Sequence, residues 1–414
     1  MRIVQSVLNL IITMLTARYL GPSNFGTINY AASIVAFFTP IVHLGFTSIL
    51  VRELISEPKA EGEILGTSLL SCIGTALCGM VGMFAFTMVA NHGETETIIV
   101  CILYSFVLLA DALGLLTYWF QAHLLSKYTS IVSLIVYIIV SAYKVFLLIT
   151  GKNVYWYAVS NVIDYALIGI LQFVVYKHLG GSRLTFSHAR FKDLFRKGKY
   201  YIISGLMIAV FAQTDRIMLK LMISAEATGL YSAAVACAGM TGFIFSAIID
   251  SAAPSIFSSV KVSQEEFENN VRCLYSVIIY CALIQNVVIT VFAKPIILII
   301  YGKQYLAAVP ALQVIVWYTT FSYIGVVRNR WLLAKERQYL IPRIDISGAL
   351  ANVVLNLILI PQFGIIGAAV ASLVTQMLAN VVMGWIIKGV RQNNKLMFQS
   401  LNPKYVVAML RKLF

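Results

Sequence analysis

Four charged residues lie well inside apolar stretches of this 414-residue sequence, and their depth limits the chemistry that they could do. Asp111, Lys144, Asp164 and Asp215 each interrupt a hydrophobic run. A charge at the bilayer centre costs about 2.5–3.5 kcal/mol on insertion scales, so a charge that persists there faces protein or a water-filled cavity. These four residues are therefore candidates for gating or ion coupling.

The neighbours of these residues refine the expectation. Lys144 and Asp164 fall at similar depth on consecutive apolar segments, which predicts a salt bridge between them. Asp215 and Arg216 are adjacent and point about 100° apart on a helix, so each needs another partner. The sequence leaves open whether Asp111, with His43 in the second apolar segment, is a packing residue or part of a proton relay.

Arginines offer a second kind of chemistry. Arg18 and Arg52 end the first two apolar segments, and Arg328 with Arg330 ends the tenth. Interface anchoring explains any one of them, whereas guanidinium groups gathered around one cavity would bind a phosphate bidentately. Together with Arg216, these four arginines are candidates for a cationic substrate site.

The elements that must position these residues are membrane helices. A helix needs about 20 apolar residues to cross the hydrocarbon core. The residues are 60% hydrophobic and 12% charged, against roughly 25% charged in soluble domains. We therefore predict an all-α integral membrane protein. Its twelve expected spans are 3–19, 27–50, 64–89, 97–118, 129–150, 155–176, 200–222, 230–252, 273–293, 311–333, 340–360 and 366–388.

A weak internal repeat indicates two halves. Aligning Gly26 with Gly229 gives an offset of 203 residues, and LLSKY at Leu124–Tyr128 matches LLAKE at Leu332–Glu336 at an offset of 208. We expect two six-helix bundles related by a pseudo-two-fold axis along the membrane normal, an arrangement used in alternating access. The predicted parts are a lobe at 1–180, a cytoplasmic basic linker at 181–199, a second lobe at 200–390 and a cytoplasmic tail at 391–414.

The distribution of basic residues predicts the orientation. With a cytoplasmic N-terminus, 24 of the 31 Lys and Arg residues fall on the cytoplasmic side and six on the outer side. The positive-inside rule therefore predicts a multi-pass protein of the cytoplasmic membrane with both termini in the cytoplasm. Phenylalanines interleave with the charges of residues 177–200, which favours attraction to anionic lipid over nucleic acid. The six cysteines lack CxxC pairs and histidine partners, so we expect no metal site and no cofactor.

Two segments carry a resemblance to a known family. They are NVVLNLILIPQFGIIGAAVAS at Asn352–Ser372 and ARYLGPSNFGTINYAAS at Ala17–Ser33. Both resemble the polysaccharide (oligosaccharide) flippases of the Wzx type, which belong to the multidrug/oligosaccharidyl-lipid/polysaccharide exporter superfamily and have a MATE-like fold. The resemblance implies a flippase that moves a polyprenyl-diphosphate-linked oligosaccharide from the inner to the outer leaflet, within two six-helix lobes around a cationic cavity.

The resemblance also implies roles for individual residues. Arg18, Arg52 and Arg216 fall on positions that carry basic residues in the family, and Asp215 falls on the acidic position of its seventh span. We expect the arginines to bind the diphosphate and Asp215 to act in gating or ion coupling. Possible partners are the lipid-linked oligosaccharide, the bilayer and the polysaccharide polymerase machinery, with no nucleic acid.

Other functions remain open at this stage. A cation-coupled multidrug exporter of the same superfamily would favour an acidic, aromatic-lined cavity, whereas here basic residues are at least as many as buried acids. An enzyme is not expected, because no GxSxG, HExxH or glycine-rich phosphate loop occurs. A scramblase remains possible, since nothing in the sequence shows that transport is driven.

Overall fold

The computed structural model describes residues 2–259 and 263–406, and the side chains of residues 11–259 and 263–406. Every regular element in this part of the chain is helical. By length and composition, ten helical segments in it could cross a membrane. The predicted all-α integral membrane fold is therefore confirmed. Contacts divide the chain into two compact units, Met1–Gly229 and Leu230–Phe414.

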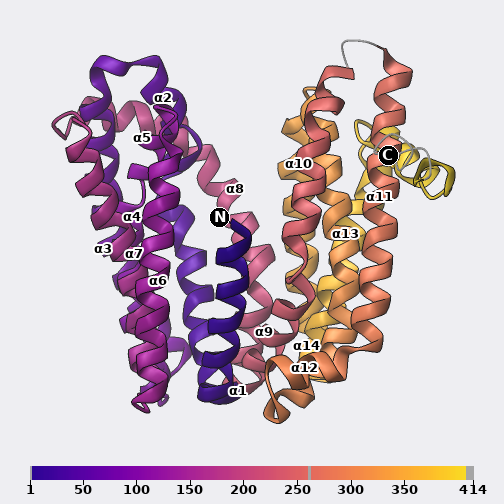
Figure 1. Ribbon diagram of the computed structural model, residues 1–414, viewed down its shortest axis with the longest axis horizontal. Helices are drawn as coiled ribbons and strands as arrows, with labels where there is room; N and C mark the ends of the chain where they lie inside the picture. The colour runs from indigo at the N-terminus through magenta and orange to yellow at the C-terminus, as the bar shows by residue number, and fades with distance from the viewer. Residues whose placement is uncertain (1, 260–262, 407–414) are drawn as a thin grey trace. The chain divides into compact units, whose positions relative to one another are not determined.

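The first unit is built from long helices that pack side by side (Figure 1). Its helices are α1 (Arg2–Val42), α2 (Leu50–Ser56), α3 (Glu61–Ala90), α4 (Thr95–Leu113), α5 (Leu116–Ala122), α6 (Ser126–Ile149), α7 (Val154–His178), α8 (His188–Met222) and the start of α9 (Ala225–Gly239), with 3-10 turns at Phe46–Ser48 and Pro58–Ala60. α1 packs against α8 and α4, and α4 packs against α7. Tyr30 and Tyr157 are fully buried in the core between α1, α4 and α7.

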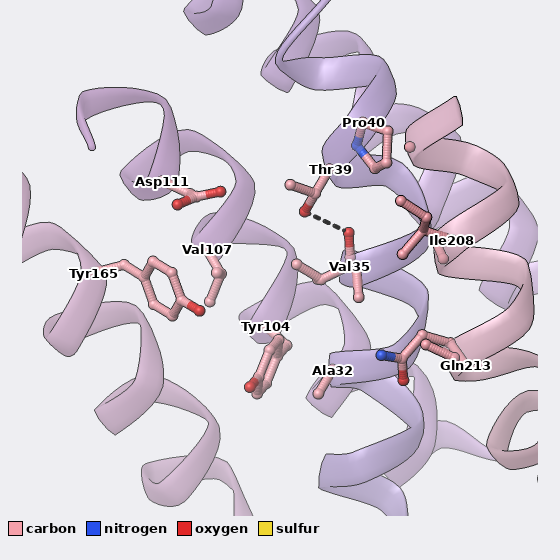
Figure 2. Close-up of a pocket in the computed structure, with 14 residues that line it drawn as sticks. Ala32, Val35, Thr39, Pro40, Tyr104, Val107, Asp111, Tyr165, Ile208 and Gln213 are labelled. Atoms are coloured by element: carbon pink, nitrogen blue, oxygen red, sulfur yellow. Dashed lines mark hydrogen bonds between the residues drawn. The ribbon is translucent and has the colours of Figure 1, made fainter. Parts of the chain in front are cut away.

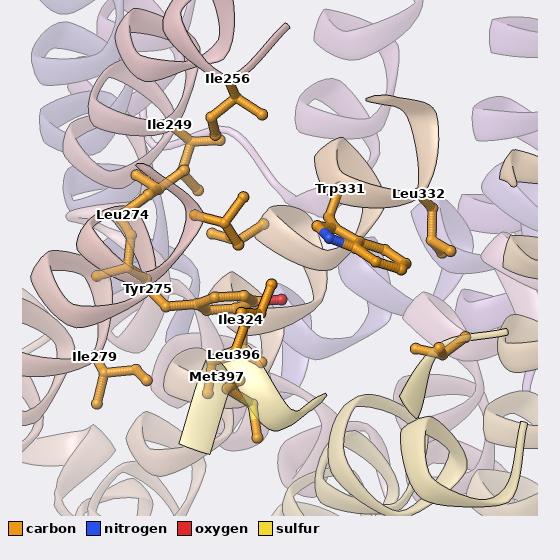
Figure 3. Close-up of a cluster of buried hydrophobic side chains, with 14 of the residues drawn as sticks. Ile249, Ile256, Leu274, Tyr275, Ile279, Ile324, Trp331, Leu332, Leu396 and Met397 are labelled. Atoms are coloured by element: carbon orange, nitrogen blue, oxygen red, sulfur yellow. The ribbon is translucent and has the colours of Figure 1, made fainter. Parts of the chain in front are cut away.

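The second unit has its own core. It contains the rest of α9 and α10 (Gly242–Ser259), α11 (Gln264–Val291), α12 (Ala293–Ile300), α13 (Val309–Ala334), α14 (Ile341–Met377), α15 (Met383–Ile386) and α16 (Arg391–Gln399), with 3-10 turns at Lys303–Ala308 and Gln338–Leu340 and a π-helical turn at Leu378–Val382. Figure 3 shows Tyr275, Ile324 and Trp331 in this core, next to Leu396 and Met397 of α16.

Two glycines turn the chain where the sequence predicts separate spans. Gly21 in α1 has φ 73° and ψ 170°, and Gly364 in α14 has φ 55° and ψ −130°. A positive φ favours glycine, which has no Cβ to clash with the backbone. Dividing α1 and α14 at these residues accounts for the two spans by which the prediction of twelve exceeds the ten segments.

Other boundaries differ from the predicted ones. α8 begins at His188, so most of the predicted linker at 181–199 continues directly into the next span. The Ser187 hydroxyl accepts a hydrogen bond from the backbone N–H of Arg190 at 3.3 Å, which caps the helix. Leu194 and Gly198 are buried and anchor its first turns. The predicted span 230–252 instead comprises parts of α9 and α10, separated by a turn at residues 240–241.

The remaining differences concern the ends of two predicted segments. The second span was expected to reach residue 50, but α1 ends at Val42 and a turn with Gly45 at φ 71° follows. Of the predicted tail at 391–414, residues 391–399 form α16, and residues 407–414 lie outside the described part of the chain.

Candidate functional site

The first unit has an open cavity of about 420 Å³ between α1, α4, α7 and α8 (Figure 2). Small-molecule sites have volumes of about 300–1,000 Å³, so this cavity is large enough to hold a ligand. Its lining comprises Ala32, Val35, Ala36, Thr39, Pro40, Tyr104, Val107, Asp111, Tyr165, Gly205, Ile208, Ala209, Ala212 and Gln213.

A proline shapes the α1 wall of the cavity. Pro40 has no N–H, so it cannot donate the helical hydrogen bond to the carbonyl oxygen of Ala36. α8 passes close to this point, because a Cβ at Gly205 would lie only 2.9 Å from Cβ of Pro40. Thr39 donates its hydroxyl hydrogen to the carbonyl oxygen of Val35 at 2.9 Å, as hydroxyls in helices commonly do. The hydroxyl oxygen of Thr39 keeps acceptor capacity.

Asp111 is the one charged residue in the lining. Its Oδ2 lies 3.0 Å from Nε2 of His43, in the turn after α1. The side chains are 25% and 13% exposed, respectively, so both are largely shielded by protein. Figure 2 shows the Asp111 carboxylate at the end of the cavity, near Val107. The lining thus has a carboxylate at one end, and Asp111 is the only one of the four gating or ion-coupling candidates that lines this cavity.

Gln213 supplies the polar group on the α8 side. Its Oε1 accepts hydrogen bonds from Ser33 Oγ at 3.0 Å and from Arg216 Nη1 at 2.9 Å. Two donors on one oxygen fix which way the amide points. Its nitrogen is therefore directed away from Ser33 and Arg216, and Figure 2 shows this atom on the side of α1, facing the lining.

Two tyrosines contribute aromatic surface. Tyr104 on α4 and Tyr165 on α7 both line the cavity and lie on its α4–α7 side (Figure 2). Neither residue was singled out from the sequence, because tyrosines in apolar spans are most often packing or anchoring residues. Thr39 and Gln213 were not singled out either, because uncharged polar residues in membrane helices commonly hydrogen-bond to neighbouring helices.

The predicted arginine candidates do not gather in this cavity. Arg216 is one hydrogen bond away from its lining, through Gln213. Arg18 is exposed, and Arg52 has a side chain that is 69% exposed and lies 3.1 Å from Glu53 Oε1. Asp215, beside Arg216, is buried in α8. The lining of this cavity is therefore not cationic.

Arg328 and Arg330 belong to the second unit and differ from each other. Arg328 is 2% exposed, and its Nη1 donates to the carbonyl oxygen of Ala379 at 3.1 Å and to Oδ1 of Asn380 at 2.8 Å. Both acceptors lie in the π-helical turn of this unit. Arg330 is partly exposed and pairs with Asp250 at 2.7 Å. Arg328 is thus held by hydrogen bonds inside its own unit.

The salt bridge expected between Lys144 and Asp164 is wrong. Lys144 Nζ instead donates to Oδ1 of Asn161 at 3.4 Å, and no ion pair within 4.0 Å joins Lys144 to Asp164, both of which are described. Asn161 lies three residues before Asp164, on nearly the same face of α7. The similar depth of Lys144 and Asp164 in their spans did not determine whether Asp164 or Asn161 would accept the hydrogen bond from Lys144.

Solved membrane transporters have the same fold. The chain matches the lipid II flippase MurJ in an inward closed conformation with a TM-score of 0.76 and 15% identity, covering 99% of this chain and 91% of that one. It matches an inward-facing MATE-family multidrug transporter of the MOP superfamily with a TM-score of 0.70 and 13% identity, covering 95% and 96% of the two chains. The MATE-like fold is confirmed, and identities this low show the fold alone.

Two sequence relatives are named for the biosynthesis of teichuronic acid and of a glycan. The chain is 26% identical to the teichuronic acid biosynthesis protein TuaB of Bacillus subtilis, over 61% of this chain and 52% of TuaB. It is 25% identical to the probable low-salt glycan biosynthesis flippase Agl15 of Haloferax volcanii, over 45% and 40% of the two chains. The chain thus spans about half the length of the curated relatives that it matches.

A family model covers more than half of the chain. The model for polysaccharide biosynthesis proteins matches residues 1–260, which include the whole first unit and its cavity. The resemblance found in the sequence is confirmed, and the chain belongs to the family of polysaccharide biosynthesis proteins.

Proposed function

We propose that the protein is a flippase that moves a polyprenyl-diphosphate-linked oligosaccharide from the inner to the outer leaflet of the cytoplasmic membrane. The observation that carries this proposal is the cavity between membrane helices in the first unit, whose lining includes Asp111 and Gln213 and lies within the region that matches the polysaccharide biosynthesis family. Sugar hydroxyls need hydrogen-bond partners when they leave water. Asp111 and Gln213 are such partners at the depth of the spans.

The chemistry of the substrate explains why a protein is needed. An ionised phosphate in a medium of low dielectric is disfavoured by an energy on the order of tens of kcal/mol, whereas a polyprenyl tail is at home in lipid. A protein that shelters only the head group therefore removes most of the barrier. Exposing the sheltered site first to one face and then to the other is alternating access.

Among the predicted diphosphate-binding residues, Arg216 is best supported for the first unit. It is close to the cavity without lining it, and its hydrogen bond to Gln213 places a positive charge next to a lining residue. Arg18, Arg52, Arg328 and Arg330 stay candidates from the sequence. Asp111 leads the gating or ion-coupling candidates because it lines the cavity, and Lys144, Asp164 and Asp215 stay candidates from their depth.

Orientation and partners belong to the same proposal. We infer from the excess of Lys and Arg on one side that both termini face the cytoplasm. Delivery of a flipped unit to a polysaccharide polymerase follows from the proposed role, since the lipid-linked unit must be consumed on the outer side.

One observation favours a second function, export of cationic drugs. The lining holds a single charge, the acid Asp111, together with two tyrosines. Organic cations bind to such a combination of carboxylate and aromatic faces. The count of charged residues in the sequence argued against a multidrug exporter, whereas the lining of this cavity is compatible with one.

Deletion of the gene separates the two functions. Lipid-linked oligosaccharide, surface polysaccharide and susceptibility to cationic drugs are measured in the same strains. Loss of surface polymer with accumulation of the lipid-linked unit supports the flippase. Intact polymer with greater drug susceptibility supports the exporter and contradicts the flippase.

A further inference from the structure

The charge of the cavity does not match the diphosphate of the proposed substrate. Among the lining residues only Asp111 is charged, and it is an acid. A second negative charge brought next to it is repelled. A diphosphate therefore does not belong inside this cavity, so another part of the substrate has to occupy it.

The polar groups of the lining form the complement of a sugar hydroxyl. A hydroxyl both donates and accepts a hydrogen bond. An ionised Asp111 carboxylate only accepts, and the amide nitrogen of Gln213 only donates. The amide oxygen of Gln213 is already bound by Ser33 and Arg216, which leaves the nitrogen to meet a ligand. Hydrogen bonds to a carboxylate are roughly twice as strong as neutral ones. The cavity therefore offers an acceptor at one end and an oriented donor at the other.

The rest of the lining suits the apolar face of a sugar ring. Tyr104 and Tyr165 present aromatic surface from α4 and α7, and Val35 and Ile208 present aliphatic surface from α1 and α8. Figure 2 shows these side chains around the space between Asp111 and Gln213. A pocket with a few placed polar groups in a mainly apolar wall is the usual form of a small-molecule site.

The position of Arg216 fits the linkage between sugar and lipid. Its guanidinium donates to Gln213 Oε1 at 2.9 Å, yet Arg216 is not among the lining residues. A sugar held between Asp111 and Gln213 would place its phosphate-bearing carbon toward one of the two ends. At the Gln213 end, the hydrogen bond from Arg216 puts a positive charge next to the lining.

We infer that this cavity binds the sugar next to the diphosphate, with the diphosphate outside it near Arg216, and that Asp111 selects neutral or amine-bearing sugars over uronic acids. The inference rests on the proposed function, since it assumes a lipid-linked saccharide as substrate. It adds a chemical class to that substrate. It also gives Asp111 the role of a specificity determinant.

The test compares three probes on the purified full-length protein in nanodiscs. They are farnesyl diphosphate, farnesyl-diphospho-glucose and farnesyl-diphospho-glucuronic acid, and binding is followed by native mass spectrometry. We expect the glucose probe to bind about tenfold more tightly than the glucuronic acid probe, as a like-charge penalty requires. Asp111→Asn should bring the two affinities to within about twofold, and binding of farnesyl diphosphate should not change.

Two further variants keep the test decisive. Ala36→Leu fills the lining without changing its charge, so it should weaken binding of the glucose probe about tenfold and leave farnesyl diphosphate unaffected. Asp193→Asn is the matched control, because Asp193 pairs with Lys197 at 2.7 Å on the first turns of α8 and does not line the cavity. It should preserve the preference for glucose.

The failures of the two proposals are distinguishable. Equal binding of all three probes, unchanged in Asp111→Asn and Ala36→Leu, overturns the sugar site and leaves the flippase standing. Preference for the glucuronic acid probe also overturns the sugar selection. Binding of none of the probes, with binding of a cationic dye such as rhodamine 6G that Asp111→Asn abolishes, overturns the flippase as well.

Discussion

Gly26 and Gly229 face each other with no room for a side chain on either. A Cβ at Gly26 would lie 1.8 Å from the carbonyl oxygen of Ala225, and one at Gly229 would lie 1.9 Å from the carbonyl oxygen of Pro22. Small residues allow membrane helices to approach this closely. The same two glycines are matched by the internal repeat, so the two equivalent positions of the repeat meet in the first unit.

Gly229→Ala should therefore prevent correct packing of α1 against α9. The added methyl group meets backbone, which cannot rotate away, and overpacking of a core costs about 1–3 kcal/mol or more. The measurement is the thermal unfolding midpoint of the detergent-solubilised protein. Gly74→Ala is the control, because no atom lies within 4 Å of its Cβ position. Equal midpoints for the two variants would contradict the close contact.

Arg328→Lys should destabilise the second unit. The single nitrogen of a lysine cannot donate both to Ala379 and Asn380, as Nη1 does, and to Asn329, as Nε and Nη2 do. A buried acceptor left without a donor costs about 1–3 kcal/mol. Arg330→Lys is the matched control, since its ion pair with Asp250 is partly exposed and such pairs contribute about 0–1 kcal/mol. Scanning fluorimetry of both variants checks the order, and a larger loss for Arg330→Lys would reverse the assignment.

Arg216→Ala should abolish transport and leave membrane insertion intact. The substitution removes the positive charge next to the cavity and releases the amide of Gln213. Surface polysaccharide is measured in a deletion strain that carries the variant, with the amount of protein in the membrane measured in parallel. Arg196→Ala, on an exposed face of α8, should complement fully. Normal polymer with Arg216→Ala would remove Arg216 from the mechanism.

Glu57 should give the first unit a stability that depends on pH. The hydrogen bonds and the charge of Arg190, which lies 3.0 and 2.7 Å from its two oxygens, lower the pKa of the Glu57 carboxyl. A lowered pKa in the folded state means that the contribution is complete above the ordinary pKa of glutamate and is lost as the pH falls through the folded-state value. The thermal midpoint of the wild type should therefore fall more steeply than that of Glu57→Gln between pH 6 and pH 3, roughly. Parallel curves would show that the pair contributes nothing.

The sequence predicted the membrane spans better than the points where helices begin, end or break. Hydrophobic length located nearly every helix because the bilayer sets that length. It could not show that Gly21 and Gly364 turn the chain within continuous helical segments, since a positive φ leaves no trace in hydropathy. Composition likewise could not show that residues 188–199 and the next span form one helix, α8, in which Leu194 and Gly198 are buried.

For the candidate site, the sequence predicted the type of one residue, the acid Asp111, but not the residues that would surround it. A carboxylate at the depth of Asp111 is costly enough to be conspicuous in the sequence. Its neighbours His43 and Tyr165 come from distant segments, and only packing brings them to it. The same holds for Lys144. Its depth in the sequence predicted Asp164 as its partner, but α7 is rotated so that Asn161 accepts the hydrogen bond from Lys144.

The segment between α7 and α8 is tied down along its length. The backbone N–H of Thr185 donates to the carbonyl oxygen of Gly62 at 3.1 Å, and that of Ser187 donates to Thr67 Oγ1 at 3.0 Å. The Ser182 hydroxyl donates to Glu61 Oε1 at 2.6 Å. An epitope or fluorescent reporter inserted at 182–187 would break these hydrogen bonds. Labels that report which side of the membrane a segment faces are therefore better placed at the exposed residues 402–404.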